Sequence, residues 1–292
     1  MLDGIHIKQL TGLGIMTMLS KLELITKRIL KEKTKRDVEK GGISSITISP
    51  PGEGKTNQLM HDVVTLLKYC PDEIIFWRDN PKSAVQYNKK GVKWEIFVEG
   101  GCDIKFRNLS EGGELNVNYR YFNNFNDILD MDTGKGFAKT GQVNVIYFKE
   151  EYTWIDFLEH LRHTIGWQSI FIDEIEDLIP LNPPKREGES RNIRYGKNLF
   201  FAENFKEFRK GWINFFANTQ DLADIESRVR RKLNYIVYLK GARVEERSPV
   251  SQSSVNRLQK GWAYMEFEHG SYGRIKFDYY PNNLPYFEVI IS

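Results

Sequence analysis

Cysteine is scarce in this sequence, and long apolar runs are missing. Its two cysteines, Cys70 and Cys102, are too few for a disulfide scaffold and lack the pair spacing of a metal site. No apolar stretch reaches the roughly 18 to 20 residues that a membrane-spanning helix needs, since Lys21 and Glu23 interrupt the most apolar one. The apolar run 13–19 is short for a signal peptide and has no small-residue cleavage site after it. We therefore expect a cytoplasmic protein without a transmembrane segment.

The chain also has little excess charge of either sign. Lysine and arginine number 42 against 39 aspartates and glutamates, a net charge of +3. So small an excess does not by itself indicate a polyanionic partner. Hydrophobic residues make up 40% and charged residues 28% of the chain, the balance of a folded protein rather than a disordered one. Its 292 residues suffice for one large core, or for one core with a small appendage.

Short apolar strands alternate with helical patterns along most of the sequence. Strands are predicted over 43–49, 73–77, 92–98, 143–148, 169–172, 212–217 and 234–239, and helices over 56–69, 154–163, 198–210 and 222–232. Continuous apolar strands between helices favour an α/β fold, with a mostly parallel sheet covered by helices on both faces. Alternating aromatic residues beyond Gly261 predict a terminal hairpin or edge strands.

These patterns divide the chain into three segments. Residues 1–42 form an N-terminal segment with a basic amphipathic helix over 12–36, which could pack on the core, on a neighbouring subunit or on an anionic surface. Residues 43–245 form the core, with inserted strands at about 92–122. Residues 246–292 form a C-terminal β extension of that core.

A glycine-rich loop joins the first predicted strand to the first core helix. Ser49-Pro-Pro-Gly-Glu-Gly-Lys-Thr56 matches the phosphate-binding pattern G-x-x-x-x-G-K-[ST] except at Ser49, which replaces the first glycine. Loop amides at the start of a helix can wrap an anion. Lys55 would bridge the β- and γ-phosphates of ATP, and the Thr56 hydroxyl would bind Mg²⁺. The nucleotide-binding residues are then Pro51, Gly52, Glu53, Gly54, Lys55, Thr56 and Asn57.

A second apolar strand ends in two acids, Asp173 and Glu174. A buried parallel strand would deliver Asp173 to the carboxyl edge of the sheet, where it could hold Mg²⁺ through water. Glu174 would orient and polarise the attacking water in phosphoryl transfer. A third apolar strand ends in Asn218-Thr-Gln220. We expect it beside the acidic strand and close to the loop strand, so that Gln220 can reach the γ-phosphate or the water.

In this order, the three strand ends resemble the HerA/FtsK superfamily of P-loop ATPases. The segment Asn218-Thr-Gln-Asp-Leu-Ala-Asp-Ile-Glu-Ser-Arg-Val-Arg-Arg231 is similar to the family's Thr-Gln followed by a short helix and an arginine before the next strand. The resemblance covers about 43–240 and implies a P-loop NTPase fold of the ASCE or RecA-like kind. It also implies a homo-oligomeric, usually hexameric, ring whose hydrolysis needs an arginine from the adjacent subunit. The candidates for that arginine are Arg228, Arg230 and Arg231.

Two functions follow from this resemblance. The first is a ring motor that uses Mg-ATP hydrolysis to translocate or package double-stranded DNA, in a host cytoplasm if the protein is viral. The alternative is a Zot-like, secretion or virion-assembly ATPase that acts on a protein or a membrane-associated partner. A nucleotide switch with negligible turnover is disfavoured, because a switch does not need Glu174. The basic segment 185–197, expected to be an exposed loop, could contact DNA phosphates.

Overall fold

The structure is a computed structural model that describes residues 41–78, 92–108, 118–183, 185, 187–188, 192–267, 270–277 and 287–291. The helix expected over 12–36 lies outside these residues. None of the described helices is both long enough and apolar enough to cross a membrane. The three-segment division of the chain stays a prediction.

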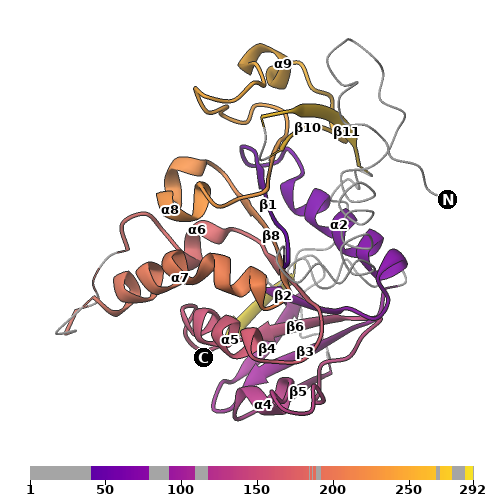
Figure 1. The fold of residues 1–292 in the computed structure, drawn as a ribbon. Coiled ribbons are helices and arrows are strands. Elements are labelled where there is room, and N and C mark those ends of the chain that lie inside the picture. Colours follow the sequence, from indigo (N-terminus) through magenta and orange to yellow (C-terminus); the bar gives the residue numbers. More distant parts are fainter. Residues whose placement is uncertain are drawn as a thin grey trace.

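A ten-stranded sheet runs through the described part of the molecule (Figure 1). Its strand order is β11-β10-β9-β1-β8-β7-β2-β6-β3-β5. The β9–β10 and β10–β11 pairs are antiparallel and the other pairs are parallel, as predicted for the core and for the terminal hairpin. The strands are β1 (Ser44–Ile48), β2 (Ile74–Arg78), β3 (Trp94–Glu99), β5 (Tyr119–Phe122), β6 (Val143–Tyr147), β7 (Gln168–Ile172), β8 (Ile213–Thr219), β9 (Tyr235–Tyr238), β10 (Trp262–Phe267) and β11 (Tyr272–Lys276).

Strands β3 and β5, from the predicted insertion, extend the sheet beyond β6. The third strand of that region, β4 (Ile104–Asn108), leaves the main sheet and pairs with β12 (Phe287–Ile291). This second, two-stranded sheet joins the insertion to the end of the chain. The pairing was not predicted, because neither strand carries a local signal for a partner so distant in sequence.

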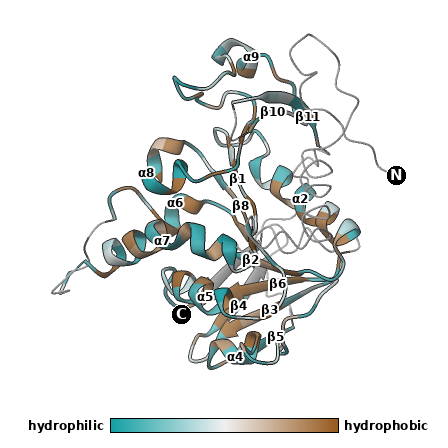
Figure 2. Cartoon of the chain, in the orientation of Figure 1, coloured by the Kyte–Doolittle hydropathy of each residue, from teal (hydrophilic) through white to brown (hydrophobic). Residues whose placement is uncertain are grey.

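Helices cover both faces of the sheet. Helix α2 (Lys55–Tyr69) lies on one face, and α5 (Thr153–Arg162) and α7 (Ile193–Lys210) lie on the other (Figure 1). Successive strand residues face opposite ways, so Phe76 packs into the core under α5 and α7, whereas Ile75 and Trp77 pack into the core under α2. Figure 2 shows β3 and β6 as largely hydrophobic. The shorter helices are α4 (Phe125–Ile128), α6 (Ile175–Leu178), the 3₁₀ helix η2 (Leu222–Asp224), α8 (Ser227–Arg230) and α9 (Gln252–Asn256).

Two expected elements differ in the structure. Helix α7 begins at Ile193 rather than at 198, because the Asn192 side chain accepts a hydrogen bond from the Tyr195 amide (2.9 Å) and caps the helix. The exposed-loop prediction is therefore wrong for 193–197. The single helix expected over 222–232 is two short ones, because Asp221 and Glu226 each accept hydrogen bonds from the amides that follow them and start separate turns.

Candidate functional site

The phosphate loop and both polar strand ends meet at one edge of the sheet. Strand β8 pairs in parallel with β1 on one side and with β7 on the other. The carboxyl ends of all three strands therefore lie side by side, where ligands of open α/β sheets bind. The prediction that the third strand lies beside the acidic strand and close to the loop strand is confirmed, and the structure places it between the two.

The loop has the backbone geometry of a phosphate-binding turn. Gly52 and Gly54 have φ angles of 81° and 95°, a left-handed conformation that side chains disfavour, and α2 begins directly after Gly54. Ser49 is not among the described residues with positive φ, so glycine is not needed at that position. Its amide donates to the Thr219 carbonyl at 3.2 Å, which ties the loop to the end of β8. Lys55, the first residue of α2, is 8% exposed.

A hydrogen bond connects the loop helix to the acidic strand end. The Thr56 hydroxyl donates to the Asp173 carboxylate and lies 3.2 and 3.1 Å from its two oxygens. The Asn218 amide nitrogen, from β8, also donates to this carboxylate. Burial raises the pKa of Asp173, although these hydrogen bonds and the Lys55 charge act in the opposite direction. Hard oxygen ligands of this kind suit Mg²⁺, which binds through one or two carboxylates together with phosphate oxygens.

Glu174 has an unusual backbone conformation for its residue type. Its φ of 54° lies in the left-handed region, where a residue other than glycine is strained. The two neighbouring strands hold it there: its amide donates to Asn218 Oδ1 at 2.8 Å, and Arg78, at the end of β2, donates to its carbonyl at 3.4 Å. Arg78 also donates to the Asp173 carbonyl at 3.1 Å. Burial, and next the Asp173 charge, raise the pKa of Glu174.

Gln220 lies at the same edge but is exposed. Its amide donates to Glu176 Oε1 at 3.2 Å, so the end of β8 is attached to the turn after β7. Burial raises the pKa of Glu176. The contact brings the backbone of Gln220 next to the acidic residues that follow β7.

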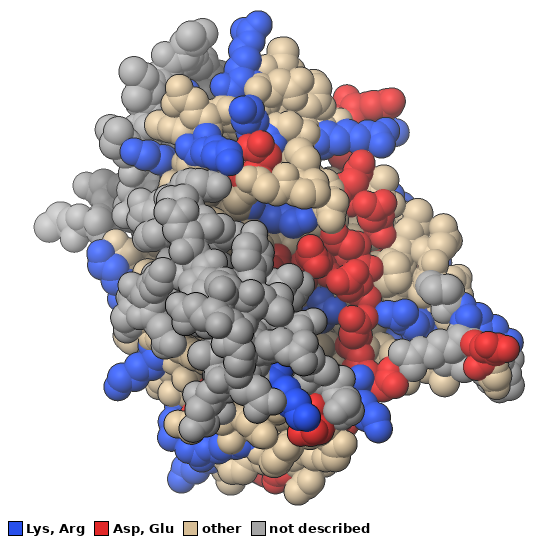
Figure 3. Space-filling view, turned by 180° about the vertical axis from the view of Figure 1, so that it is seen from behind, with Lys and Arg blue, Asp and Glu red and all other residues tan. Residues whose placement is uncertain are grey.

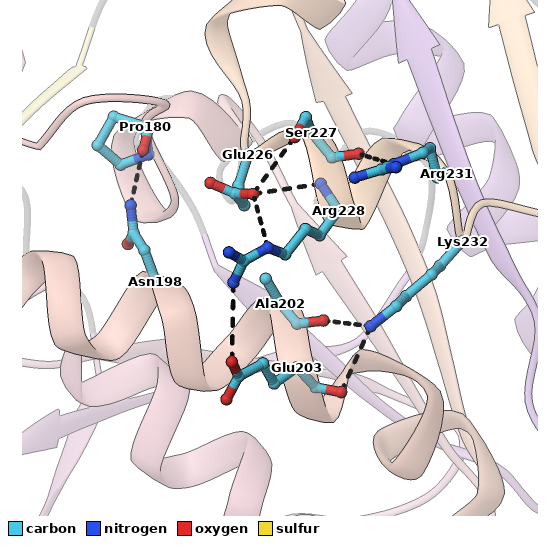
Figure 4. Close-up of polar contacts among 9 residues, drawn as sticks. All are labelled: Pro180, Asn198, Ala202, Glu203, Glu226, Ser227, Arg228, Arg231 and Lys232. Atoms are coloured by element: carbon cyan, nitrogen blue, oxygen red, sulfur yellow. Dashed lines mark hydrogen bonds and ion pairs between the residues drawn. The ribbon is translucent and has the colours of Figure 1, made fainter.

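The three candidate arginines contact other parts of the chain. Arg228 forms ion pairs with Glu226 (3.9 Å) and with Glu203 of α7 (3.7 Å), as Figure 4 shows. The Arg231 side chain donates to the Ser227 carbonyl at 3.4 Å (Figure 4). The third arginine, Arg230, pairs with Glu245 at 3.4 Å. Of the sequence-predicted residues, the structure thus brings together Lys55, Thr56, Asp173 and Glu174. Arg228 and Arg230 pair with carboxylates elsewhere, and Arg231 contacts a backbone carbonyl.

Asn218 and Arg78 were missed as site residues by the sequence reasoning. Asn218 belongs to the strand end that drew attention to Gln220, and an amide in a buried strand beside two acids was a usable signal. Arg78 ends an otherwise apolar strand, which was a weaker signal because the neighbour of that strand was unknown. Both residues hold the acidic turn from opposite sides.

Carboxylates follow the ends of several parallel strands. Glu150 and Glu151 follow β6, Asp173 and Glu174 follow β7, and Asp221 lies just beyond the end of β8. Figure 3 shows acidic side chains gathered in a stripe on the face of the molecule opposite to that seen in Figure 1. Two cations of the basic segment pair with carboxylates of the chain itself: Arg194 with Glu151 at 3.0 Å, and Lys197 with Asp156.

Comparisons with known proteins agree with this architecture. No family model matches the sequence, and no curated protein matches it. The genome packaging NTPase B204 from Sulfolobus turreted icosahedral virus 2, in complex with sulfate, is similar with a TM-score of 0.51 and 12% identity, over 82% of this chain and 98% of that chain. Its complex with AMPPCP gives a TM-score of 0.50 at the same identity and coverage.

The N-terminal domain of zonular occludens toxin from Neisseria meningitidis is also similar, over 82% of this chain and 95% of that one. Its TM-score of 0.33 and 13% identity are too low to carry an argument. At 12% identity, the B204 likeness shows the fold and no more. The chain thus has an α/β fold with a mostly parallel sheet, like that of the B204 packaging NTPase, as its pattern of strands and helices predicted.

Proposed function

We propose that this protein is an ATPase that binds Mg-ATP between the phosphate loop and the acids of β7. The observation that carries the proposal is the hydrogen bond from Thr56 to both oxygens of Asp173. It links the loop that would bind the phosphates to the strand that would bind the metal. Mg²⁺, when bound there by Thr56 and Asp173, would neutralise charge on the phosphates.

The other residues of the site take the roles of a phosphoryl-transfer centre in this proposal. Lys55 binds the phosphates, and the loop from Pro51 to Asn57 surrounds them with backbone amides. Glu174 accepts a proton from the attacking water and orients it, and Gln220 reports on the γ-phosphate. The fixed backbone of Glu174 supports this role, since a base must be held in place to be effective.

We further propose that ATP turnover moves double-stranded DNA. The support is the fold shared with an NTPase described as a genome packaging enzyme. In this proposal the chain forms a homo-oligomeric ring, hexameric by the family resemblance, in which Arg228, Arg230 or Arg231 acts on the nucleotide of the adjacent subunit. Side chains of Arg228 and Arg231 are exposed, as a residue that acts across a subunit boundary must be.

The acidic stripe favours a second candidate, an assembly or secretion ATPase with a protein, virion or membrane-associated partner. Carboxylates line the strand ends, and Arg194 and Lys197 of the basic segment are paired with Glu151 and Asp156. Such a surface repels DNA rather than attracting it. DNA would then have to bind another face of the assembly.

Phosphate release from Mg-ATP tests the ATPase proposal. Lys55→Ala should lose nucleotide binding and turnover, because the main cation of the phosphate site is removed. Lys68→Ala is the matched control, since Lys68 is an exposed lysine in the last turn of the same helix. Full ATPase activity in the Lys55 variant would contradict the proposal.

The substrate is tested by the same assay with duplex DNA over a series of salt concentrations. A DNA motor should be stimulated by DNA, with an affinity that falls steeply as salt rises because phosphate contacts release counterions. Turnover that ignores DNA but responds to anionic lipid vesicles would contradict the DNA proposal and support the second candidate.

A further inference from the structure

The segment after β9 passes over the phosphate loop. Strand β9 pairs with β1, and the Leu239 amide donates to the Ile48 carbonyl at 3.0 Å, one residue before the loop begins. Gly241 then approaches Pro50 closely: a Cβ atom at this glycine would lie 3.1 Å from Pro50 Cγ. The C-terminal part of the chain is therefore packed against the first residues of the loop.

The chain returns to the same loop at the start of β10. There the Lys260 ammonium lies 3.4 Å from the carbonyl oxygen of Gly52 and donates a hydrogen bond to it. The backbone beside Lys260 is fixed, because the Phe277 amide donates to the Gly261 carbonyl at 2.9 Å and the Trp262 amide donates to the Gln259 carbonyl at 3.1 Å. A lysine held at the base of the β10–β11 hairpin thus contacts the centre of the phosphate loop.

Little around Gly52 constrains the orientation of its backbone. A Cβ atom at Gly52 would have no neighbour within 4 Å, and its φ of 81° is one that glycine adopts freely. Sterics therefore do little to fix the peptide between Gly52 and Glu53. This peptide is trans, so its carbonyl and its N–H point in opposite directions. By binding the carbonyl, Lys260 directs the Glu53 N–H to the other side.

We propose that Lys260 is a positioning residue that orients the Gly52–Glu53 peptide so that its N–H can bind a nucleotide phosphate. Successive N–H groups that point the same way are what make such a loop an anion site. The position of the C-terminal hairpin then sets the affinity of the loop for phosphate. This inference rests on the proposed function of the loop as an ATP site.

The test uses the full chain with Lys260→Ala, Lys260→Arg and a control, Lys276→Ala. Lys276 lies on the same hairpin, with its ammonium 5.8 Å from the Trp262 ring. Binding is measured for Mg-ATP and for inorganic triphosphate, which has no base or sugar. We expect Lys260→Ala to weaken the affinity for both ligands by about five- to tenfold. This is the effect of losing one charge-assisted hydrogen bond, the one from the Glu53 N–H to a phosphate. Lys260→Arg and Lys276→Ala should stay within about twofold of the parent protein.

Backbone NMR of the nucleotide-free protein provides a readout that does not depend on the ATP site being used. Lys260→Ala should broaden or shift the resonances of Gly52, Glu53 and Gly54 and leave the thermal unfolding midpoint unchanged. Unchanged resonances, or an affinity for triphosphate equal to that of the parent, would overturn the inference, as would an equal loss in Lys276→Ala. If the parent itself binds no triphosphate, the proposed function fails, and the NMR comparison still decides the orienting role.

Discussion

At the scale of single residues, burial governs the acids of the site. Asp173 is 6% exposed, and the desolvation that accompanies such burial raises its pKa and that of Glu174. An acid with a raised pKa is a stronger base when ionised, which suits Glu174 for water activation. The same burial makes ionised Asp173 unfavourable until a cation is bound. The two acids therefore give separate predictions.

Glu174→Gln should bind ATP normally and hydrolyse it at least about a hundredfold more slowly, because a positioned base is lost. In the parent protein Glu174 acts only when ionised. Since its pKa is raised, the turnover rate should begin to fall on acidification at a pH above the ordinary range of glutamate. A pH–rate profile of phosphate release checks this. Turnover in Glu174→Gln equal to that of the parent would remove Glu174 from the mechanism.

Asp173→Asn should stabilise the nucleotide-free protein and abolish the Mg²⁺-dependent part of ATP binding. Because the folded-state pKa of Asp173 is raised, its contribution to stability is complete below the unfolded-state pKa and is lost as the pH rises through the folded-state pKa. At neutral pH the ionised carboxylate is therefore a cost that asparagine avoids. Thermal unfolding should show a rise of about 2–4 °C at pH 7 that disappears in acid. A lower midpoint at pH 7 would contradict this account.

At the scale of elements, local signals predicted what local sequence determines. The strand, loop and helix around the Gly-Lys-Thr sequence follow from a β-branched run, two prolines and two glycines, and the apolar strands around Asp173 and Asn218 follow from their composition. The strained backbone of Glu174 and the contacts of Arg78 could not be predicted, because they depend on which strands are neighbours. The start of α7 was missed because one side chain, Asn192, determines it.

Helix α8 gives the prediction that belongs to this scale. We expect at least one of the variants of Arg228, Arg230 and Arg231 to be inactive alone. Mixing that variant with Lys55→Ala protein should restore part of the ATPase activity. The reason is that a mixed ring pairs an intact phosphate loop with an intact arginine from its neighbour. Phosphate release from the mixtures measures the restored activity. The control is Arg243→Ala, because Arg243 is an exposed arginine that pairs with Asp221. Unchanged activity in all three arginine variants would end this part of the account.

At the scale of the whole molecule, the sheet brings the parts of the site together. Ser49, Asp173 and Gln220 are far apart in sequence and meet because β8 lies between β1 and β7. The place of the third strand beside the acidic strand and close to the loop strand was predicted, whereas the acidic stripe was not, since a net charge of +3 gives no hint of how charges are distributed.

The claim that Thr56, Asp173 and the phosphate loop form a single Mg-ATP site has a direct spectroscopic test. Mn²⁺ can replace Mg²⁺, and electron–nuclear double resonance then detects phosphorus atoms next to the bound ion. With a non-hydrolysable ATP analogue we predict strong phosphorus coupling in the parent protein, and its loss in Thr56→Ala and in Asp173→Asn. Phosphorus coupling that survives in both variants, or Mn²⁺ bound without any such coupling in the parent, would contradict the account.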